Sequence, residues 1–302
     1  MRKKFAELIQ QHAAKDESIV FLTGDLGYNA LESLQQSMGD RFINAGVAEQ
    51  NMVGMAAGMA RSGYKVFCYS IAPFVVYRCL EQTRNDVCLH NLPVFLVGNG
   101  GGYGYGIMGS SHHALEDIAC LAPLQNMSCH VPAFIEDLET SMHAIVNESR
   151  PAYLRLGLGK QAPSEQLLFD AFRCVHKSTS AQHTVIAMGP LVNNVLAAMQ
   201  QHEKADPIDL FTAIRFPFRS IPQQLIDSIK QSKRIILLEE HVAQGGLAQQ
   251  FLYHFAKLNI ATDSITTLHA QGYPGQIYGD QAFHQKQSGL DTQSIAKLII
   301  SA

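Results

Sequence analysis

Short apolar segments alternate with longer segments of helical periodicity along most of this 302-residue chain. This alternation limits the fold more than any other feature, because strands that alternate with helices form a parallel sheet covered by helices on both faces. In the first half, the expected strands are 18–24, 41–45, 64–70, 92–98, 126–132 and 151–157. The helices expected in the same half are 29–37, 49–62, 74–90 and 134–149.

The alternation stops in a polar stretch and then starts again. The later strands are expected at 183–189, 207–211, 233–240 and 264–269, and the later helices at 191–204, 221–231, 245–257 and 291–300. The sequence therefore predicts an α/β protein with two open, mostly parallel sheets, each with helices on both faces. We expect a first domain at 1–158, a linker at 159–180 and a smaller second domain at 181–302.

The composition argues against several classes of protein. The net charge is −3 and no basic run is present, so charge-driven binding to nucleic acid is not expected. No run of 18 apolar residues predicts a membrane span, and residues 1–15 are typical of an amphipathic helix and not of a signal peptide. The six cysteines lack the spacing of a metal site, so we expect them to be reduced core residues. A cytoplasmic location follows as an expectation.

Three loops that follow expected strands have residues suited to chemistry. They are "TGDLGYN" with Asp25, "NAGVAEQN" with Glu49, and the glycine-rich "GNGGGYGYGIMGSSHHALED" with His112 and His113. In open parallel sheets, ligands bind outside the carboxyl ends of the strands. The sequence therefore predicts a functional site where these loops meet.

Glu49 is unusual because small and apolar residues surround it. By helical spacing it shares a face with Met52 and Val53, and Gly54 and Gly58 allow another backbone to come close. A buried carboxylate is costly unless it is paired or protonated. The first turn of a helix also favours a negative charge, so a simple capping role remains an alternative.

The glycine-rich loop includes a GxGxxG pattern at 104–109, but this pattern does not directly follow a strand and open a helix. It is therefore a weak signal for a dinucleotide, and a loop that only needs glycine dihedrals is the alternative. His112 and His113 at the end of the loop suit proton transfer near neutral pH. Two adjacent histidines without further ligands do not predict a metal site.

These segments together resemble the transketolase family of thiamine diphosphate enzymes. Residues 42–78 look like its pyrimidine-binding domain, and "MGSSHHALED" (108–117) is similar to its Gly-Pro-Thr-His segment. The segment "LLEEHVAQGGLAQQFL" (237–252) resembles the Glu-Glu…Gly-Gly segment of the family's C-terminal domain. The resemblance implies a pyrimidine-binding domain followed by a smaller transketolase C-terminal-type domain.

The resemblance also implies a cofactor site. In this family, the glutamate at the position of Glu49 contacts the aminopyrimidine ring of thiamine diphosphate and shares a proton with a ring nitrogen. Phe74 and Tyr77 match aromatic residues that cover the pyrimidine, although both also suit core packing. Asp25 matches an aspartate near the cofactor across the subunit interface, with a loop-capping role as the alternative.

The resemblance is less complete for the residues that bind the substrate. His112 matches the family histidine that contacts substrate oxygens and transfers protons, so Glu49 and His112 are the expected catalytic residues. His113 stands where many relatives have glutamine, and Ser111 beside it can add hydrogen bonds. The arginine that many relatives use for sugar phosphate is Leu158 here, and Arg155 nearby could substitute for it.

One half of the cofactor site is missing from the sequence. Family members hold the diphosphate through a metal bound by Gly-Asp-Gly and a later Asn-Asn, and this chain has no Gly-Asp-Gly. The resemblance thus implies a C-terminal half that works as a separate subunit and has no metal site of its own. A partner chain would supply the diphosphate site with Mg²⁺ or Ca²⁺, and we expect an α2β2 heterotetramer.

The function implied is that of the beta subunit of a split transketolase. Such an enzyme transfers a two-carbon ketol unit from a ketose to an aldose, with sugars or sugar phosphates as substrates. The alternatives are the beta subunit of a 2-oxoacid dehydrogenase decarboxylase component and an enzyme like deoxyxylulose phosphate synthase. A non-catalytic regulatory subunit is a further alternative, and the retention of Glu49 and His112 argues against it.

Overall fold

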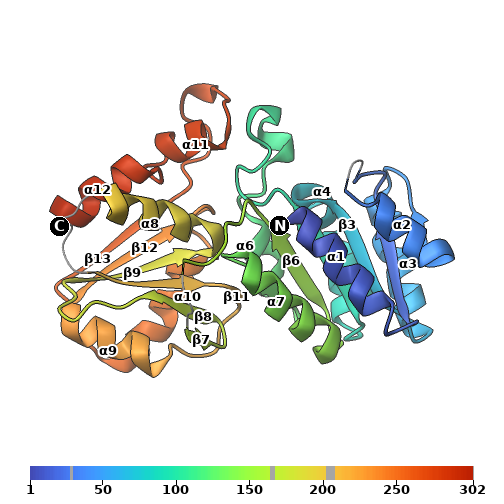
Figure 1. Cartoon of the computed structure of the whole chain (residues 1–302), viewed down its shortest axis with the longest axis horizontal. Coiled ribbons are helices and arrows are strands. Elements are labelled where there is room, and N and C mark those ends of the chain that lie inside the picture. Colours follow the sequence, from blue (N-terminus) through green and yellow to red (C-terminus); the bar gives the residue numbers. More distant parts are fainter. Residues whose placement is uncertain (28–29, 164–166, 202–207, 302) are drawn as a thin grey trace.

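The computed structural model describes residues 1–27, 30–163, 167–201 and 208–301. Two twisted sheets lie side by side, each with helices above and below it (Figure 1). Within each sheet most neighbouring strands run parallel, so the expected fold class is confirmed. No helix of the described chain is long and apolar enough to cross a membrane. All six cysteines are free.

The first sheet has seven strands in the order β11-β5-β6-β4-β3-β1-β2. Its strands are β1 (Ile19–Thr23), β2 (Phe42–Asn44), β3 (Lys65–Ile71), β4 (Val94–Asn99), β5 (Ser128–His130), β6 (Ala152–Leu156) and β11 (Arg215–Phe216). Six of them are parallel and agree with the strands expected from the sequence. The seventh, β11, comes from the second half of the chain and pairs antiparallel with β5.

Alternating side chains on the strands explain why helices cover both faces of this sheet. In β1, Ile19 and Phe21 pack into one buried cluster, whereas Val20 and Leu22 pack into another. The first cluster is covered by α1 (Arg2–Ala13), α2 (Glu32–Met38) and α7 (Ile135–Glu148). The second is covered by α3 (Glu49–Arg61), α4 (Ala72–Val76), the π-helical turn Thr83–Cys88 and α6 (Asp117–Leu121).

The second sheet has six strands in the order β13-β12-β9-β10-β8-β7. Its strands are β7 (Leu167–Phe169), β8 (Phe172–His176), β9 (His183–Met188), β10 (Ile208–Ala213), β12 (Arg234–Glu239) and β13 (Ser264–His269). Its helices are α8 (Val192–Gln201), α9 (Gln223–Ser232), α10 (Leu247–Phe255), α11 (Gln281–Gln287) and α12 (Thr292–Ser301). Figure 1 shows α8 and α12 on one face of the sheet and α9 on the other.

The segment expected to be a linker, 159–180, contains two of these strands. β8 pairs antiparallel with β10, and β7 pairs with β8 at the edge of the second sheet. The polar residues on either side of β8 hide this strand in the sequence. Its charged Arg173 is buried and forms an ion pair with Asp137 of α7. Residues 167–169 and 172–176 therefore belong to the second sheet, and the expected linker does not extend beyond residue 166.

The two sheets share one hydrophobic cluster. It includes Cys129 from β5 and Val131 directly after this strand, Phe216 from β11, and Phe211 and Leu237 from the second sheet. Because β11 crosses from one sheet to the other, the boundary between the domains is a packed interface and not a flexible hinge. This interface brings the glycine-rich loop after β4 against the second domain.

Candidate active site

The carboxyl ends of β1 and β3 meet the first turn of α3, and Glu49 lies at this point. Its side chain is only 1% exposed. Ser70 at the end of β3 donates a hydrogen bond of 2.9 Å from Oγ to Oε1 of Glu49. Arg78 forms an ion pair with the other oxygen, with Nη1 2.6 Å from Oε2. The carboxylate is therefore buried but paired, which meets the cost of burying a charge.

Gly24, directly after β1, leaves the room that Glu49 needs. A Cβ atom at this position would lie 3.2 Å from both Oε1 of Glu49 and Oγ of Ser70. Contacts this short would push the carboxylate or the hydroxyl out of place. Glycine at position 24 thus allows Glu49 and Ser70 to keep their hydrogen bond.

Arg78 connects Glu49 to the aromatic ring of Phe74 and, through this ring, to the imidazole of His112. The guanidinium carbon of Arg78 lies 4.6 Å from the ring centre of Phe74, a cation–π geometry. The ring of Phe74 in turn meets His112 edge-on at 5.1 Å. Glu49, Arg78, Phe74 and His112 form a continuous series of contacts, which we call the Glu49 cluster. The structure thus brings together three of the residues expected in the site and adds Arg78.

His112 is half-buried at the end of the glycine-rich loop. Its Nδ1 lies 2.9 Å from Oγ of Ser111, and its ring lies 5.9 Å from that of Tyr105. Its Nε2 has no hydrogen-bond partner within the described chain, so this nitrogen can exchange a proton with a ligand. The side chain therefore has the geometry of an acid–base group held at one nitrogen.

His113 occupies a different environment. It is 2% exposed, its Nε2 lies 2.8 Å from the carbonyl oxygen of Gly106, and its Nδ1 lies 3.0 Å from the hydroxyl of Tyr273. Burial lowers the pKa of His113, which favours the neutral ring. The structure does not support the expected substrate contact, because both ring nitrogens are used within the protein and the side chain packs against the second domain.

Asp25 and Tyr77 both have hydrogen-bond partners within the protein, as expected for residues with structural roles. Asp25 has a positive φ of 59° and accepts a hydrogen bond of 2.8 Å from Nδ2 of Asn44, as a residue that shapes a loop does. The hydroxyl of Tyr77 donates to Oε2 of Glu116 at 2.8 Å and accepts from the backbone N–H of Glu116 at 3.0 Å. Burial raises the pKa of the Tyr77 hydroxyl. Both side chains lie near the loops of the site, and their contact with a cofactor stays a prediction.

Arg155, on β6, is 6% exposed and serves the contact between the domains. Its Nε lies 2.9 Å from Oδ2 of Asp117, and its Nη2 donates to the carbonyl oxygens of Ala114 at 2.8 Å and Glu240 at 3.0 Å. Leu158, which stands where relatives have an arginine, is 76% exposed. The structure places Arg155 beside Leu158 on an interdomain cavity and not in the Glu49 cluster.

Two residues of the site do not stand out in the sequence. Ser70 and Arg78 bind Glu49, and they lie in the segments "KVFCYS" and "FVVYR". Arg78 follows Phe74 by one helical turn, which is a readable signal for a shared face. Glu240 accepts a hydrogen bond of 2.7 Å from the backbone N–H of Tyr103 in the glycine-rich loop, although it is distant in sequence. Nothing local could predict that contact.

The Glu49 cluster fits an aminopyrimidine. Each carboxylate oxygen has two acceptor positions, and Ser70 and Arg78 use one on each oxygen, so two positions of Glu49 are left for a further group. Phe74 offers a partly exposed aromatic face beside it. The described residues include no group of three or more His, Cys, Asp or Glu side chains that could hold a metal ion. The cluster thus has a carboxylate and an aromatic face that suit an aminopyrimidine ring.

Comparison with known proteins agrees with the sequence resemblance. The family described as "Transketolase, pyrimidine binding domain" matches residues 1–162, more than half of the chain. The B subunit of the apulose-4-phosphate transketolase of Actinobacillus succinogenes is 30% identical over 274 residues, which covers 87% of this chain and 85% of that protein. The protein of the same name from Phocaeicola vulgatus is 31% identical, covering 82% of this chain and 80% of the relative.

A larger relative and a solved structure complete the comparison. The 1-deoxy-D-xylulose-5-phosphate synthase of Clostridium perfringens is 25% identical over 98% of this chain, which corresponds to 48% of that enzyme. A solved structure described as "Split gene transketolase, inactive beta4 tetramer" superposes with a TM-score of 0.81 over all of this chain and 97% of its own. Because its sequence identity is 22%, this likeness supports the fold alone.

Proposed function

The chain belongs to the transketolase family, and from this we infer that it is the C-terminal (beta) subunit of a split transketolase. The enzyme would transfer a two-carbon ketol unit from a ketose donor to an aldose acceptor. Two relatives that this chain covers over most of their length are named as transketolase B subunits, which supports the division into two chains. The single observation that carries the proposal is the buried Glu49 in contact with Arg78, which leads through Phe74 to His112.

We propose that thiamine diphosphate binds with its pyrimidine ring against this chain and that it supplies, when bound, the nucleophilic carbon of the reaction. Glu49 holds a proton at the pyrimidine ring, and Ser70 keeps the carboxylate in place. Phe74 packs on the ring, with Tyr77 and Asp25 near it. His112 moves a proton at a substrate oxygen, where Ser111 fixes the opposite ring nitrogen.

The diphosphate end requires a second chain. The absence of Gly-Asp-Gly from the sequence and of a metal-binding group from the described residues supports a partner that holds Mg²⁺ or Ca²⁺ with the diphosphate. We propose an α2β2 assembly, in which Asp25 faces the cofactor across the subunit contact. This arrangement is consistent with the names of the two transketolase relatives, each of which is one subunit of its enzyme.

The test is reconstitution with a partner. The chain is co-expressed with a transketolase-type chain that contains Gly-Asp-Gly and Asn-Asn, and the purified complex is screened with ketoses, ketose phosphates, apulose 4-phosphate and pyruvate as donors. Ketol transfer to an aldose from any ketose, with no carbon dioxide released, supports the proposal. Activity only with pyruvate, with release of carbon dioxide, contradicts it.

That second result would favour the candidate related to deoxyxylulose phosphate synthase. This candidate is kept because a synthase from Clostridium perfringens aligns over 98% of this chain. Both enzymes would use the Glu49 cluster in the same way and differ in the donor. The donor screen therefore separates them.

A further inference from the structure

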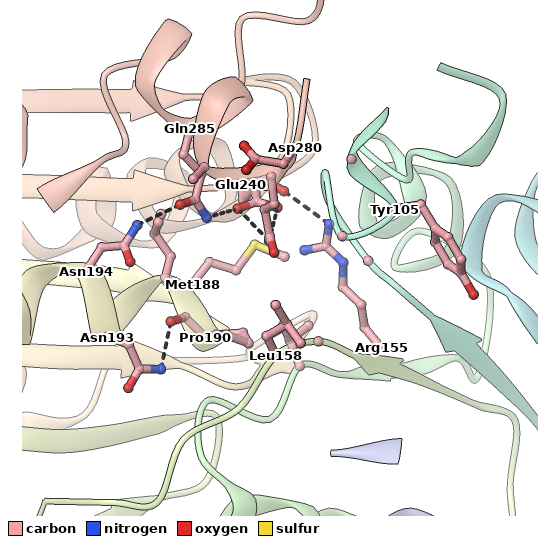
Figure 2. A pocket seen from close by; sticks show the side chains of 18 of the residues that line it. Tyr105, Arg155, Leu158, Met188, Pro190, Asn193, Asn194, Glu240, Asp280 and Gln285 are labelled. Atoms are coloured by element: carbon pink, nitrogen blue, oxygen red, sulfur yellow. Dashed lines mark hydrogen bonds between the residues drawn. The ribbon is translucent and has the colours of Figure 1, made fainter. Parts of the chain in front are cut away.

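A cavity of about 650 Å³ lies between the two domains, apart from the Glu49 cluster (Figure 2). It is formed where β4 and β6 of the first sheet and β9 and β12 of the second sheet reach their carboxyl ends. Ligand sites of α/β proteins prefer this end of the strands and the contacts between domains, and their volumes are in this range. Neither Glu49, Phe74 nor His112 lines the cavity.

Two cationic side chains from the first domain have donors left at this cavity. Arg155 is buried, and its Nε and Nη2 are bound to Asp117 and to two carbonyl oxygens. Within the described parts of the chain its second terminal nitrogen, Nη1, has no partner, and neither has the ammonium group of the exposed Lys160. Figure 2 shows the guanidinium of Arg155 turned toward the Glu240 side of the cavity. An anionic group here would gain charge-assisted hydrogen bonds.

The two carboxylates on the cavity wall already have donors. Glu240 accepts from the N–H of Tyr103 at 2.7 Å, from Nε2 of Gln281 at 2.9 Å and from Nε2 of Gln285 at 2.5 Å. Asp280 caps α11 by accepting from the N–H of Phe283 at 2.8 Å. The described chain also lacks a cluster of side chains suited to a metal ion. Arg155 and Lys160 therefore keep free donors on the first-domain side of the cavity, which favours an anionic group there. On the second-domain side, the second carboxylate oxygen of Asp280 accepts no hydrogen bond from the described chain and can accept from a hydroxyl group.

The remaining wall is suited to a short hydroxylated carbon chain. Asn193 and Asn194 use their amide nitrogens on Pro190, Gln285 and Leu290, and nothing in the described chain donates to their amide oxygens. These oxygens can accept from hydroxyl groups. Met188, Pro190 and Leu191 add apolar surface to the lining.

We infer that this interdomain cavity is a second ligand site, which binds a small hydroxylated anion: a short carbon chain with hydroxyl groups and one carboxylate or phosphate group. The anionic group lies at Arg155 and Lys160, and the hydroxyl groups lie at the amides of Asn193 and Asn194. The site goes beyond the proposed function and does not depend on it. Its ligand would contact Gly101, Gly104 and Tyr105 of the glycine-rich loop that leads to His112.

The test is calorimetric titration of the full chain with D-gluconate, glycerol 3-phosphate and inorganic phosphate. We expect sub-millimolar binding of at least one of the two organic anions and weaker binding of inorganic phosphate, which lacks the hydroxylated chain. Comparison of gluconate with glycerol 3-phosphate decides between a carboxylate and a phosphate ligand. Lys160→Gln and Leu158→Glu should each weaken the binding fivefold or more, because one removes a cation and the other adds an anion at an exposed rim position.

Two controls make the result specific. Lys230→Gln makes the same charge change on α9, away from the cavity lining, and should leave the binding unchanged. His112→Ala should leave it unchanged as well, because His112 belongs to the Glu49 cluster. The proposal is overturned if neither organic anion binds, if Lys230→Gln weakens binding as much as Lys160→Gln, or if only His112→Ala abolishes it.

Discussion

At the residue scale, the contact between Glu49 and Arg78 decides what the carboxylate can do. The surrounding sequence is small and apolar, so the sequence predicts a carboxylate that is either paired or protonated. The structure gives Glu49 a cationic partner at 2.6 Å and a hydroxyl donor at 2.9 Å. Since Arg78 is 41% exposed, its side chain can move when a ring nitrogen takes up part of the carboxylate. We therefore regard Arg78 as the residue that holds Glu49 before the cofactor binds.

Glu49→Gln should remove most of the activity and leave the fold intact. Glutamine has nearly the same shape and can still accept from Ser70, but it cannot hold an acidic proton for the pyrimidine. In the reconstituted complex we expect hydrogen–deuterium exchange at C2 of the cofactor to slow by more than tenfold, a change in the barrier of about 1.4 kcal/mol or more. An exchange rate within about threefold of the wild type, worth roughly 0.7 kcal/mol, would reduce Glu49 to a helix cap.

The two adjacent histidines should respond to mutation in different ways. His112→Ala should lower turnover by about 10²-fold or more, in the range of lost acid–base catalysis, with little change in cofactor affinity. His113→Ala should instead lower the free energy of unfolding by about 1–3 kcal/mol, because it leaves Gly106 and Tyr273 without a buried partner. Steady-state kinetics and urea unfolding of both variants check this. If His113→Ala is stable but has a strongly lowered turnover, His113 would be the catalytic histidine and His112 the structural one.

This pair also shows where sequence reasoning about the site ends. The motif predicts a histidine at the end of the glycine-rich loop, and the structure has one there in contact with Phe74. The resemblance distinguishes His112 from His113, but the burial of His113 could not be predicted from the sequence, because its partner, Tyr273, lies in the second domain. Contacts across the domain interface leave no local pattern.

At the scale of elements, Glu240 connects the end of β12 to the glycine-rich loop. Its carboxylate accepts from the N–H of Tyr103 and from two glutamine side chains of α11. A Cβ at Gly102 would lie 2.2 Å from Oε1 of Glu240, so glycine is required for this close approach. Gly102 also has a positive φ of 65°, which glycine adopts readily.

Glu240→Ala should therefore loosen the glycine-rich loop. The change leaves one buried donor and two partly buried donors without this acceptor and should lower the free energy of unfolding by about 1–3 kcal/mol. Hydrogen exchange followed by mass spectrometry should show faster exchange over residues 100–106, whereas Glu240→Gln, which retains one acceptor oxygen, should have a smaller effect. Unchanged exchange in this loop would show that Glu240 does not position it.

The strands that the sequence predicts correctly are those that alternate with segments of helical periodicity. Six strands of the first sheet and four of the second follow from this alternation. β8 is not predicted because it lies in the polar stretch where the alternation stops, and β11 because two residues are too short to show any period. Both rely on distant partners, Asp137 and β5, for their place in the structure.

At the scale of the whole molecule, the proposed function divides the cofactor site between two chains. We expect the chain alone to bind thiamine diphosphate weakly or not at all, because the metal and diphosphate supply much of the affinity and the sequence has no Gly-Asp-Gly motif to hold them. Calorimetry with and without Mg²⁺ measures this directly. Micromolar, Mg²⁺-dependent binding to the chain alone would contradict the proposed division between two subunits.

The contact between the domains should also become less stable at low pH, because His241 becomes protonated there. It is fully buried at the end of β12, where its Nδ1 donates to the carbonyl oxygen of Val242 at 2.7 Å and its Nε2 accepts from the N–H of Ala119, in the first domain, at 3.3 Å. A second proton would turn the acceptor Nε2 into a donor that faces another donor. Burial lowers the pKa of His241 to about 4.

The sign of the pH effect follows from proton uptake on unfolding. Between about pH 6.5 and 4 the unfolded chain binds a proton at this residue that the folded chain does not, so stability is fully present above 6.5 and is lost as the pH falls toward 4. The neighbouring Glu239, whose pKa burial raises to about 8, acts in the opposite direction, so the test compares variants and not the total curve. His241→Asn should be less stable than the wild type at pH 7.5 by urea unfolding, and the difference should narrow by about 2–3 kcal/mol at pH 4.5. A difference that stays constant between the two pH values would mean that His241 does not titrate with folding, and the acid sensitivity of the interface would then belong to other groups.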